Sequence, residues 1–199
     1  MEVGTIKRLY KNKDNLAGLS LFFLFLALYL FIFYFKITRG QVDNDCISDE
    51  CRYIQYAKNI LNGFYSPPPP DVDLVSGPGF PLFLAPFQLL GIQRKGIIII
   101  NIILSSTTVC ILFLLSRFFI NYRLSILLSS AWGFYYIHYN SIFSAETEVF
   151  ASLLFVSSFY FYTLYTIKNN KIFLILSGFS FGWLVLTKVI FSYVLLFIL

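Results

Sequence analysis

Long apolar runs alternate with short polar segments along most of the chain. The first apolar run covers residues 16–35, close to the roughly 20 residues that a helix needs to cross a bilayer, and no small-residue cleavage site follows it. We therefore interpret it as a retained helix and not as a signal peptide. Similar apolar runs follow it, and the pattern predicts spans at about 16–35, 97–115, 124–139, 149–167 and 172–187.

The last apolar run, residues 189–199, is too short for a further span. Its eleven residues cannot cross a hydrocarbon core of about 30 Å at about 1.5 Å per helical residue. We expect residues 1–199 to be the N-terminal part of a longer transmembrane module whose C-terminal remainder is missing.

One long polar stretch, residues 41–86, interrupts the apolar pattern and forms most of a predicted external loop at 37–95. Ser48 followed by Asp49 and Glu50 is typical of a helix start, with a hydroxyl cap and two acids in the first turn. Apolar residues then recur at spacings of three and four up to Leu61, which predicts a helix lying on the membrane surface and ending at Asn62-Gly63.

The second half of the loop is rich in proline. Four consecutive prolines, 67–70, predict a stiff extended segment. Gly77-Pro78-Gly79-Phe80-Pro81 predicts a tight corner, and residues 81–90 predict a second short juxtamembrane helix. The fold class predicted is therefore an all-α polytopic membrane protein with a long first external loop that carries two juxtamembrane helices.

Composition and charge support this interpretation. The chain is 58% hydrophobic, 20% aromatic and only 13% charged, outside the range of soluble domains. The net charge of +5 comes from Lys and Arg scattered at the ends of apolar runs, so it predicts topology and not a nucleic-acid partner. Basic residues before the first span place the N-terminus in the cytoplasm: Lys7, Arg8, Lys11 and Lys13. Acids on the predicted external side are Asp43, Asp45, Asp49, Glu50, Asp71, Asp73, Glu146 and Glu148.

Other chemistry-bearing residues are sparse. Cys46 and Cys51 share the loop and could form a disulfide, although unpaired packing cysteines are the more ordinary interpretation. His138 is the only histidine. Its tyrosine neighbours indicate an interfacial aromatic belt and not a metal site. Acids that could bind a divalent cation through oxygen, but are more ordinarily solvated loop acids, are Asp43, Asp45, Asp71 and Asp73.

The acidic pair Asp49-Glu50, followed by Tyr53, Leu61-Asn62-Gly63 and GPGFPLFLAP, resembles the first external loop of the GT-C membrane glycosyltransferases, in particular the protein mannosyltransferase and aminoarabinose transferase group. The resemblance extends to SAETEVFASLLF at residues 144–155 and to Gly178, Gly182 and Thr187-Lys188. It implies a GT-C-like transmembrane bundle that moves a sugar from a polyprenyl-phosphate donor to a lipid, glycan or protein acceptor with inversion. The site would face outward from a bacterial or archaeal cell membrane, and a divalent cation could take part.

The resemblance places the catalytic base in the acidic pair, and the spacing to Tyr53 favours Asp49, with Glu50 as a further catalytic candidate. It also favours Glu146 as the acid that orients the acceptor or the base. Lys188 stands between two apolar runs, where an amine is costly unless it meets water or an anion, so we expect it to hold the lipid phosphate. Further substrate-binding candidates are Tyr53, Arg52 and Glu148, with Arg94 and Lys95 as possible helpers and Tyr56 as a cavity-lining residue.

Each of these residues also has a simpler interpretation. First-turn acids stabilise a helix by about 0.3–1 kcal/mol without any chemistry, and lysines near a membrane surface often serve topology alone. The alternative function is therefore a non-catalytic membrane scaffold or a transporter subunit. A transporter usually has ionisable residues near the bilayer midplane, and the interiors of the predicted spans contain none.

Overall fold

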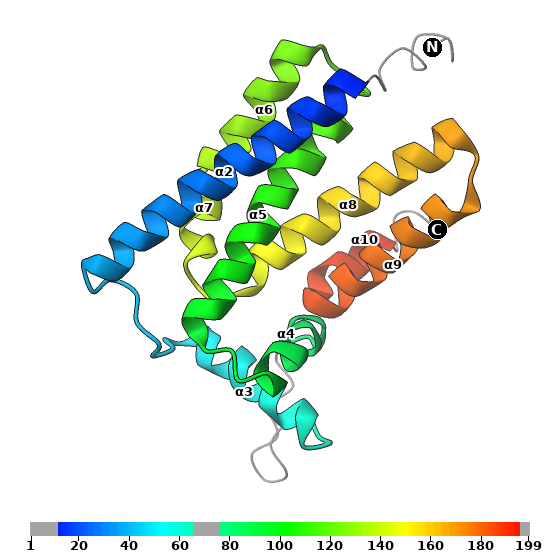
Figure 1. Ribbon diagram of the computed structural model, residues 1–199. Coiled ribbons are helices and arrows are strands. Elements are labelled where there is room, and N and C mark those ends of the chain that lie inside the picture. The colour runs from blue at the N-terminus through cyan, green and yellow to red at the C-terminus, as the bar shows by residue number, and fades with distance from the viewer. Residues whose placement is uncertain (1–11, 66–75, 196–199) are drawn as a thin grey trace.

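The computed structural model describes residues 12–65 and 76–195, and all regular structure in this part of the chain is helical (Figure 1). Three helices are long and apolar enough to cross a membrane: α2 (Asn12–Thr38), α5 (Arg94–Ser116) and α8 (Thr147–Lys168). They coincide with the first, second and fourth predicted spans. The prediction of an all-helical chain is confirmed for the described residues, which contain three helices long and apolar enough to span a membrane.

The long helices form a bundle. Helix α2 packs against α5, α5 packs against α8, and α8 packs against α9 (Lys171–Thr187) (Figure 1). On α2, buried Phe25, Tyr29 and Phe33 recur every fourth residue and face the bundle, whereas Phe23 and Phe31 are exposed. A helix that is apolar all round, with only one side covered by protein, suits a span whose other side faces lipid.

The third predicted span, residues 124–139, is wrong as a single helix. The chain there forms α6 (Tyr122–Phe134) and α7 (Tyr136–Ile142), with Tyr135 in an extended conformation between them. In a continuous helix the carbonyl of Gly133 would accept from the amide four residues on, but here it accepts from the hydroxyl of Tyr29 at 2.8 Å. This contact with α2 offers an alternative to the missing helical hydrogen bond at the break.

The fifth predicted span corresponds to α9, which has 17 residues and extends about 26 Å. It is apolar but shorter than the three candidate spans, and its crossing of the membrane stays a prediction. Beyond Lys188, a 3₁₀ turn (Val189–Phe191) and α10 (Ser192–Leu195) follow. The structure does not describe residues 1–11 and 196–199. The basic residues Lys7, Arg8 and Lys11 and the end of the last apolar run therefore lie outside the described residues.

Two short helices, α3 (Asp49–Leu61) and α4 (Gly79–Leu89), pack on each other across one end of the bundle (Figure 1). We call this end the α3–α4 end. Their positions match the two helices predicted in the loop. The predicted apolar face of α3 differs from expectation, because Ala57 is fully buried in a cluster with Phe80 and Leu84 of α4 and does not lie on a membrane surface. The proline segment 67–70, with Asp71 and Asp73, lies outside the described residues.

The start of α3 also differs from the prediction. Ser48 makes no side-chain capping hydrogen bond, and its backbone has a positive φ of 55°. The expectation of unpaired cysteines is wrong, because Cys46 and Cys51 form a disulfide that closes a loop around this turn. The amide of Cys51 donates to the carbonyl of Ser48 at 3.2 Å, so the disulfide and a turn hydrogen bond fix the same segment.

Candidate functional site

Carboxylates collect at the α3–α4 end. This end receives the start of α3, the turn between α7 and α8, and the end of α9, which are far apart in the sequence (Figure 1). At the opposite end Asp14 on α2 pairs with Arg117 after α5, at 3.1 Å. The predicted segregation of acids therefore holds for the described residues, whereas the side of the membrane that each end faces stays a prediction. Acids at the α3–α4 end are Asp43, Asp45, Asp49, Glu50, Glu146 and Glu148.

Glu50 forms a buried ion pair with Arg94, the first residue of α5. Its two carboxylate oxygens accept from Nε at 2.5 Å and from Nη2 at 3.0 Å, and the side chains are only 4% and 7% exposed. Arg94 also donates to the carbonyls of Asp43 and Phe143, each at 3.3 Å. With both oxygens engaged, Glu50 is a structural anchor and a poor candidate for a catalytic base, and Arg94 is equally unsuited to bind substrate phosphate.

Asp49 differs from its neighbour in being accessible. Its side chain is 56% exposed, and it pairs with Arg52 at 3.5 Å across one turn of α3. An ion pair between exposed groups contributes little to stability, so substrate can displace it at small cost. Of the predicted acidic pair, Asp49 alone is accessible from outside the protein.

Glu146 stands at the N-cap position of α8, where its side chain makes no capping hydrogen bond, and it is half-buried. Burial raises the pKa of its carboxyl, and the negative charge of Glu148 raises it further. Glu50 and Asp49 act in the same direction, while a hydrogen bond with Ser144 opposes them. Of the charges that raise this pKa, that of Asp49 at the start of α3 has the smallest effect.

The turn before Glu146 is held by α5. Asn101 is fully buried and donates from Nδ2 to the carbonyl of Ser144 at 2.6 Å, and Arg94 donates to the carbonyl of Phe143. Sequence reasoning did not single out Asn101. A lone asparagine inside the run IIIINIIL was a signal, since a buried amide in an apolar helix needs a partner.

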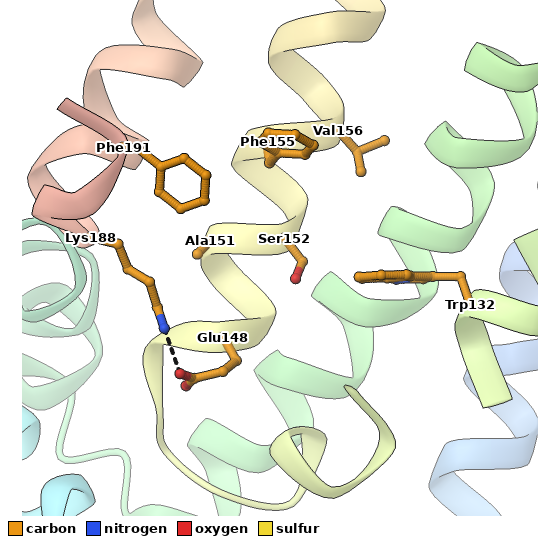
Figure 2. A pocket seen from close by; sticks show the side chains of 8 residues that line it. All are labelled: Trp132, Glu148, Ala151, Ser152, Phe155, Val156, Lys188 and Phe191. Carbon is orange, nitrogen blue, oxygen red and sulfur yellow. Dashed lines mark hydrogen bonds and ion pairs between the residues drawn. The ribbon is translucent and has the colours of Figure 1, made fainter. Parts of the chain in front are cut away.

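Lys188 and Glu148 form an ion pair of 2.6 Å at one end of a cavity of about 280 Å³ (Figure 2). The two side chains are 32% and 38% exposed, so the pair is reachable from outside. Both come from helix termini, Lys188 from the end of α9 and Glu148 from the start of α8. The rest of the lining is largely apolar: Trp132, Ala151, Ser152, Phe155, Val156 and Phe191.

The glycine corner before α4 fixes the end of α9. A Cβ atom at Gly77 would stand 2.2 Å from the carbonyl oxygen of Leu186, and one at Gly79 would stand 2.6 Å from the amide nitrogen of Thr187. Only glycine permits this approach, which a hydrogen bond from Trp183 Nε1 to the carbonyl of Gly79 (2.9 Å) reinforces. The predicted corner therefore also positions Lys188, the next residue along.

The two candidate tyrosines of α3 pack against protein. Tyr53 is half-buried, with its ring edge-on to Phe80 at 5.5 Å. Tyr56 is only 2% exposed and contacts Tyr65 at 4.8 Å between ring centroids. Tyr53 remains partly accessible beside Asp49, whereas Tyr56 does not line an open cavity.

His138 is not an interfacial residue, as its tyrosine neighbours had indicated. It is 4% exposed, and its Nε2 lies 2.7 Å from the hydroxyl of Ser105 on α5. Neighbouring Tyr135 and Tyr136 are exposed, so the belt interpretation holds for them and not for the imidazole.

Within residues 12–65 and 76–195, no group of three or more His, Cys, Asp or Glu side chains is placed to hold a metal ion. Asp43 instead accepts from the amide of Asp45 at 3.1 Å, as in a solvated turn. No family model matches the chain, and neither a curated protein nor a solved structure matches it. The GT-C resemblance thus rests on the residues quoted for it, and what it implies about activity is a proposal.

Proposed function

We propose that this chain carries the catalytic end of an inverting membrane glycosyltransferase that uses a polyprenyl-phosphate-linked sugar. One observation supports this most: Glu148 pairs with Lys188 at one end of an apolar cavity. Accessible Asp49 and half-buried Glu146 lie at the same end of the bundle. A lipid-linked sugar donor has the complementary parts, namely a hydrophobic chain, a phosphate and an electrophilic carbon beside it.

Lys188 is the proposed phosphate-binding residue. In the free protein its ammonium pairs with Glu148, which holds the amine at the cavity mouth. Phosphate oxygens accept strong charge-assisted hydrogen bonds from an ammonium group, so a donor phosphate can take the place of the carboxylate or share the lysine with it. Phe155, Val156 and Phe191 would then contact the first isoprene units of the lipid.

In the proposed reaction the acceptor hydroxyl attacks the anomeric carbon from the face opposite the phosphate. Asp49 takes the hydroxyl proton, a new carbon–oxygen bond forms, and the bond from the anomeric carbon to the phosphate oxygen breaks. The electron pair leaves with polyprenyl phosphate, whose charge Lys188 stabilises. Glu146 orients the acceptor, while Glu50 and Arg94 hold the helix start that carries Asp49.

The same proposal places the protein in a bacterial or archaeal cell membrane, with several spans, a cytoplasmic N-terminus and the α3–α4 end outward. Its partners would be the lipid-linked sugar and a lipid, glycan or protein acceptor, in the glycosylation of the cell envelope. Tyr53 and Arg52 lie on α3 one turn from Asp49, where they can contact the sugar or the acceptor.

The test is transfer from a radiolabelled polyprenyl-phosphate sugar by the full-length protein in liposomes. We expect release of polyprenyl phosphate, and a loss of about 10²–10⁴-fold for Asp49→Asn, the usual contribution of a general base. Asp45→Asn, another exposed acid in the same loop, is the matched control and should keep full activity. Undiminished transfer by Asp49→Asn overturns the mechanism, and donor binding without any transfer by the wild type favours the non-catalytic alternative.

A further inference from the structure

A second cavity, of about 450 Å³, lies between the last turns of α2 and the helix α7, apart from the cavity of Lys188. Its aromatic walls are Phe31 and Phe35 of α2 and Tyr139 of α7. Lys36, Arg39 and Gln41 supply its polar groups. The cavity therefore combines an aromatic surface on a membrane-spanning helix with two cations and an amide at the end of that helix.

The two cations have no carboxylate partner among the described residues. By contrast, Arg94, Arg117 and Lys188 are each paired with an acid. The ammonium of Lys36 lies over the Phe143 ring, 4.9 Å from its centroid. Nearby Asp43 uses a carboxylate oxygen to accept from a backbone amide. Two positive charges within one turn, beside a concave surface, repel each other unless an anion binds between them.

Topology does not account for this pair of cations. They lie at the α3–α4 end, where the acids gather and which the predicted topology places outside, so the positive-inside rule gives no reason for them. A snorkelling lysine or arginine needs no cavity beside it. Here the exposed rings of Phe31 (62%) and Phe35 (42%) continue the cavity along the lipid-facing side of α2.

We infer that the cavity at Lys36 and Arg39 is a binding site for an anionic membrane phospholipid. The phosphate would lie between the two cations and accept from the Gln41 amide, and an acyl chain would follow Phe35 and Phe31 along α2. The charges, the aromatic wall and the position at a span end each match one part of such a lipid. This site does not depend on the proposed transferase activity, since it uses none of the same residues.

The test is native mass spectrometry of the purified full chain in nanodiscs of phosphatidylcholine with increasing phosphatidylglycerol. Wild type should retain one phosphatidylglycerol in preference to phosphatidylcholine. Near an anionic surface each basic side chain contributes about a fivefold gain in affinity. Lys36→Gln and Arg39→Gln should therefore each lower the affinity for phosphatidylglycerol about fivefold, and the double variant about thirtyfold. The matched control, Arg123→Gln with Lys171→Gln, removes two exposed cations at the opposite end and should bind as wild type.

Separate arms identify the ligand. Inorganic phosphate should not displace the retained lipid. The inference is overturned if the Lys36/Arg39 double variant binds as wild type, if the control loses as much affinity, or if inorganic phosphate displaces the lipid. Unchanged circular dichroism and thermal unfolding in pure phosphatidylcholine confirm that the double variant is folded.

Discussion

Glu50 at the start of α3 and Arg94 at the start of α5 form a two-point ion pair buried at the α3–α4 end. The pair joins α3 to the candidate membrane span α5, and the same guanidinium donates to the backbone carbonyls of Asp43 and Phe143. One side chain thereby fixes the segments on both sides of Asp49 and the turn before Glu146. The candidate site depends on this junction for its shape.

We predict that Glu50→Gln destabilises the protein by about 3–5 kcal/mol, because it leaves the buried charge of Arg94 without a counter-charge. Replacing both residues, Glu50→Leu with Arg94→Met, should cost much less, since neither charge then remains in the apolar environment. Denaturant unfolding in detergent measures both. A double variant as unstable as Glu50→Gln would contradict this account of the ion pair.

The raised pKa of Glu146 predicts a pH-dependent stability. Because the folded protein favours the protonated carboxyl more than the unfolded chain does, ionisation of Glu146 opposes folding. Its contribution to stability is fully present below the unfolded pKa of about 4.3 and is lost as pH rises through the higher folded value.

Glu146→Gln should therefore stabilise the protein at pH 7, with the gain vanishing at low pH. Unfolding free energies measured between pH 3.5 and 7.5 test this, with exposed Asp45→Asn as the control that should show no such trend. If Glu146→Gln were less stable than wild type at pH 7, the folded protein would have to stabilise the charged carboxylate of Glu146, contrary to this prediction.

The disulfide between Cys46 and Cys51 gives a redox prediction. Closing a loop of this sequence separation, five, lowers the entropy of the unfolded chain enough to stabilise the fold by about 2 kcal/mol. Cys46→Ala with Cys51→Ala should lose this amount, and should lower transfer activity as well, because Asp49 lies inside the closed loop. The measurement is unfolding with and without reductant in a Cys110→Ser background, since Cys110 is free. If reductant lowered the stability of the variant without Cys46 and Cys51 as much as that of wild type, the disulfide would not be what the reductant acts on.

The long helices and the α3–α4 end could be predicted because apolar run length and turn chemistry are local signals. The helix from Asp49 to Leu61 illustrates this, since two first-turn acids and Asn62-Gly63 mark its ends. The break at Tyr135 could not be predicted in this way. It coincides with a hydrogen bond from Tyr29, about a hundred residues earlier in the sequence, to Gly133.

For the same reason, the sequence predicted which end of the protein carries the candidate site but not how its side chains pair. The sequence indicated that Asp49, Glu50, Glu146 and Lys188 belong to one end of the protein, because the alternation of spans decides this. The spacing to Tyr53 favoured Asp49 over Glu50, but the sequence could not show that Glu50 is buried against Arg94. Adjacent residues on a helix point in different directions, and only tertiary packing selects which one is buried. The pairing of Lys188 with Glu148, 40 residues apart, was equally invisible to local patterns.

The contact between the glycine corner and α9 gives the last prediction. At Gly79 an added methyl group would meet backbone atoms, the amide nitrogen of Thr187 at 2.6 Å and the carbonyl carbon of Leu186 at 2.8 Å. Backbone cannot rotate away as a flexible side chain can, so the end of α9 must shift. Gly79→Ala should cost about 1–3 kcal/mol of stability, as overpacking does, and should weaken donor-phosphate binding because Lys188 moves with the helix end.

Gly178→Ala is the matched control on α9. A Cβ atom there meets nothing within 4 Å, so the substitution should leave stability unchanged or raise it by up to about 1 kcal/mol, as alanine does inside a helix. Thermal unfolding and binding of a polyprenyl phosphate should thus separate the two variants, with both quantities reduced only for Gly79→Ala. If Gly79→Ala were tolerated as well as Gly178→Ala, the glycine corner would not be what holds Lys188 at the end of the cavity. The position of Lys188 would then have to come from its ion pair with Glu148 alone.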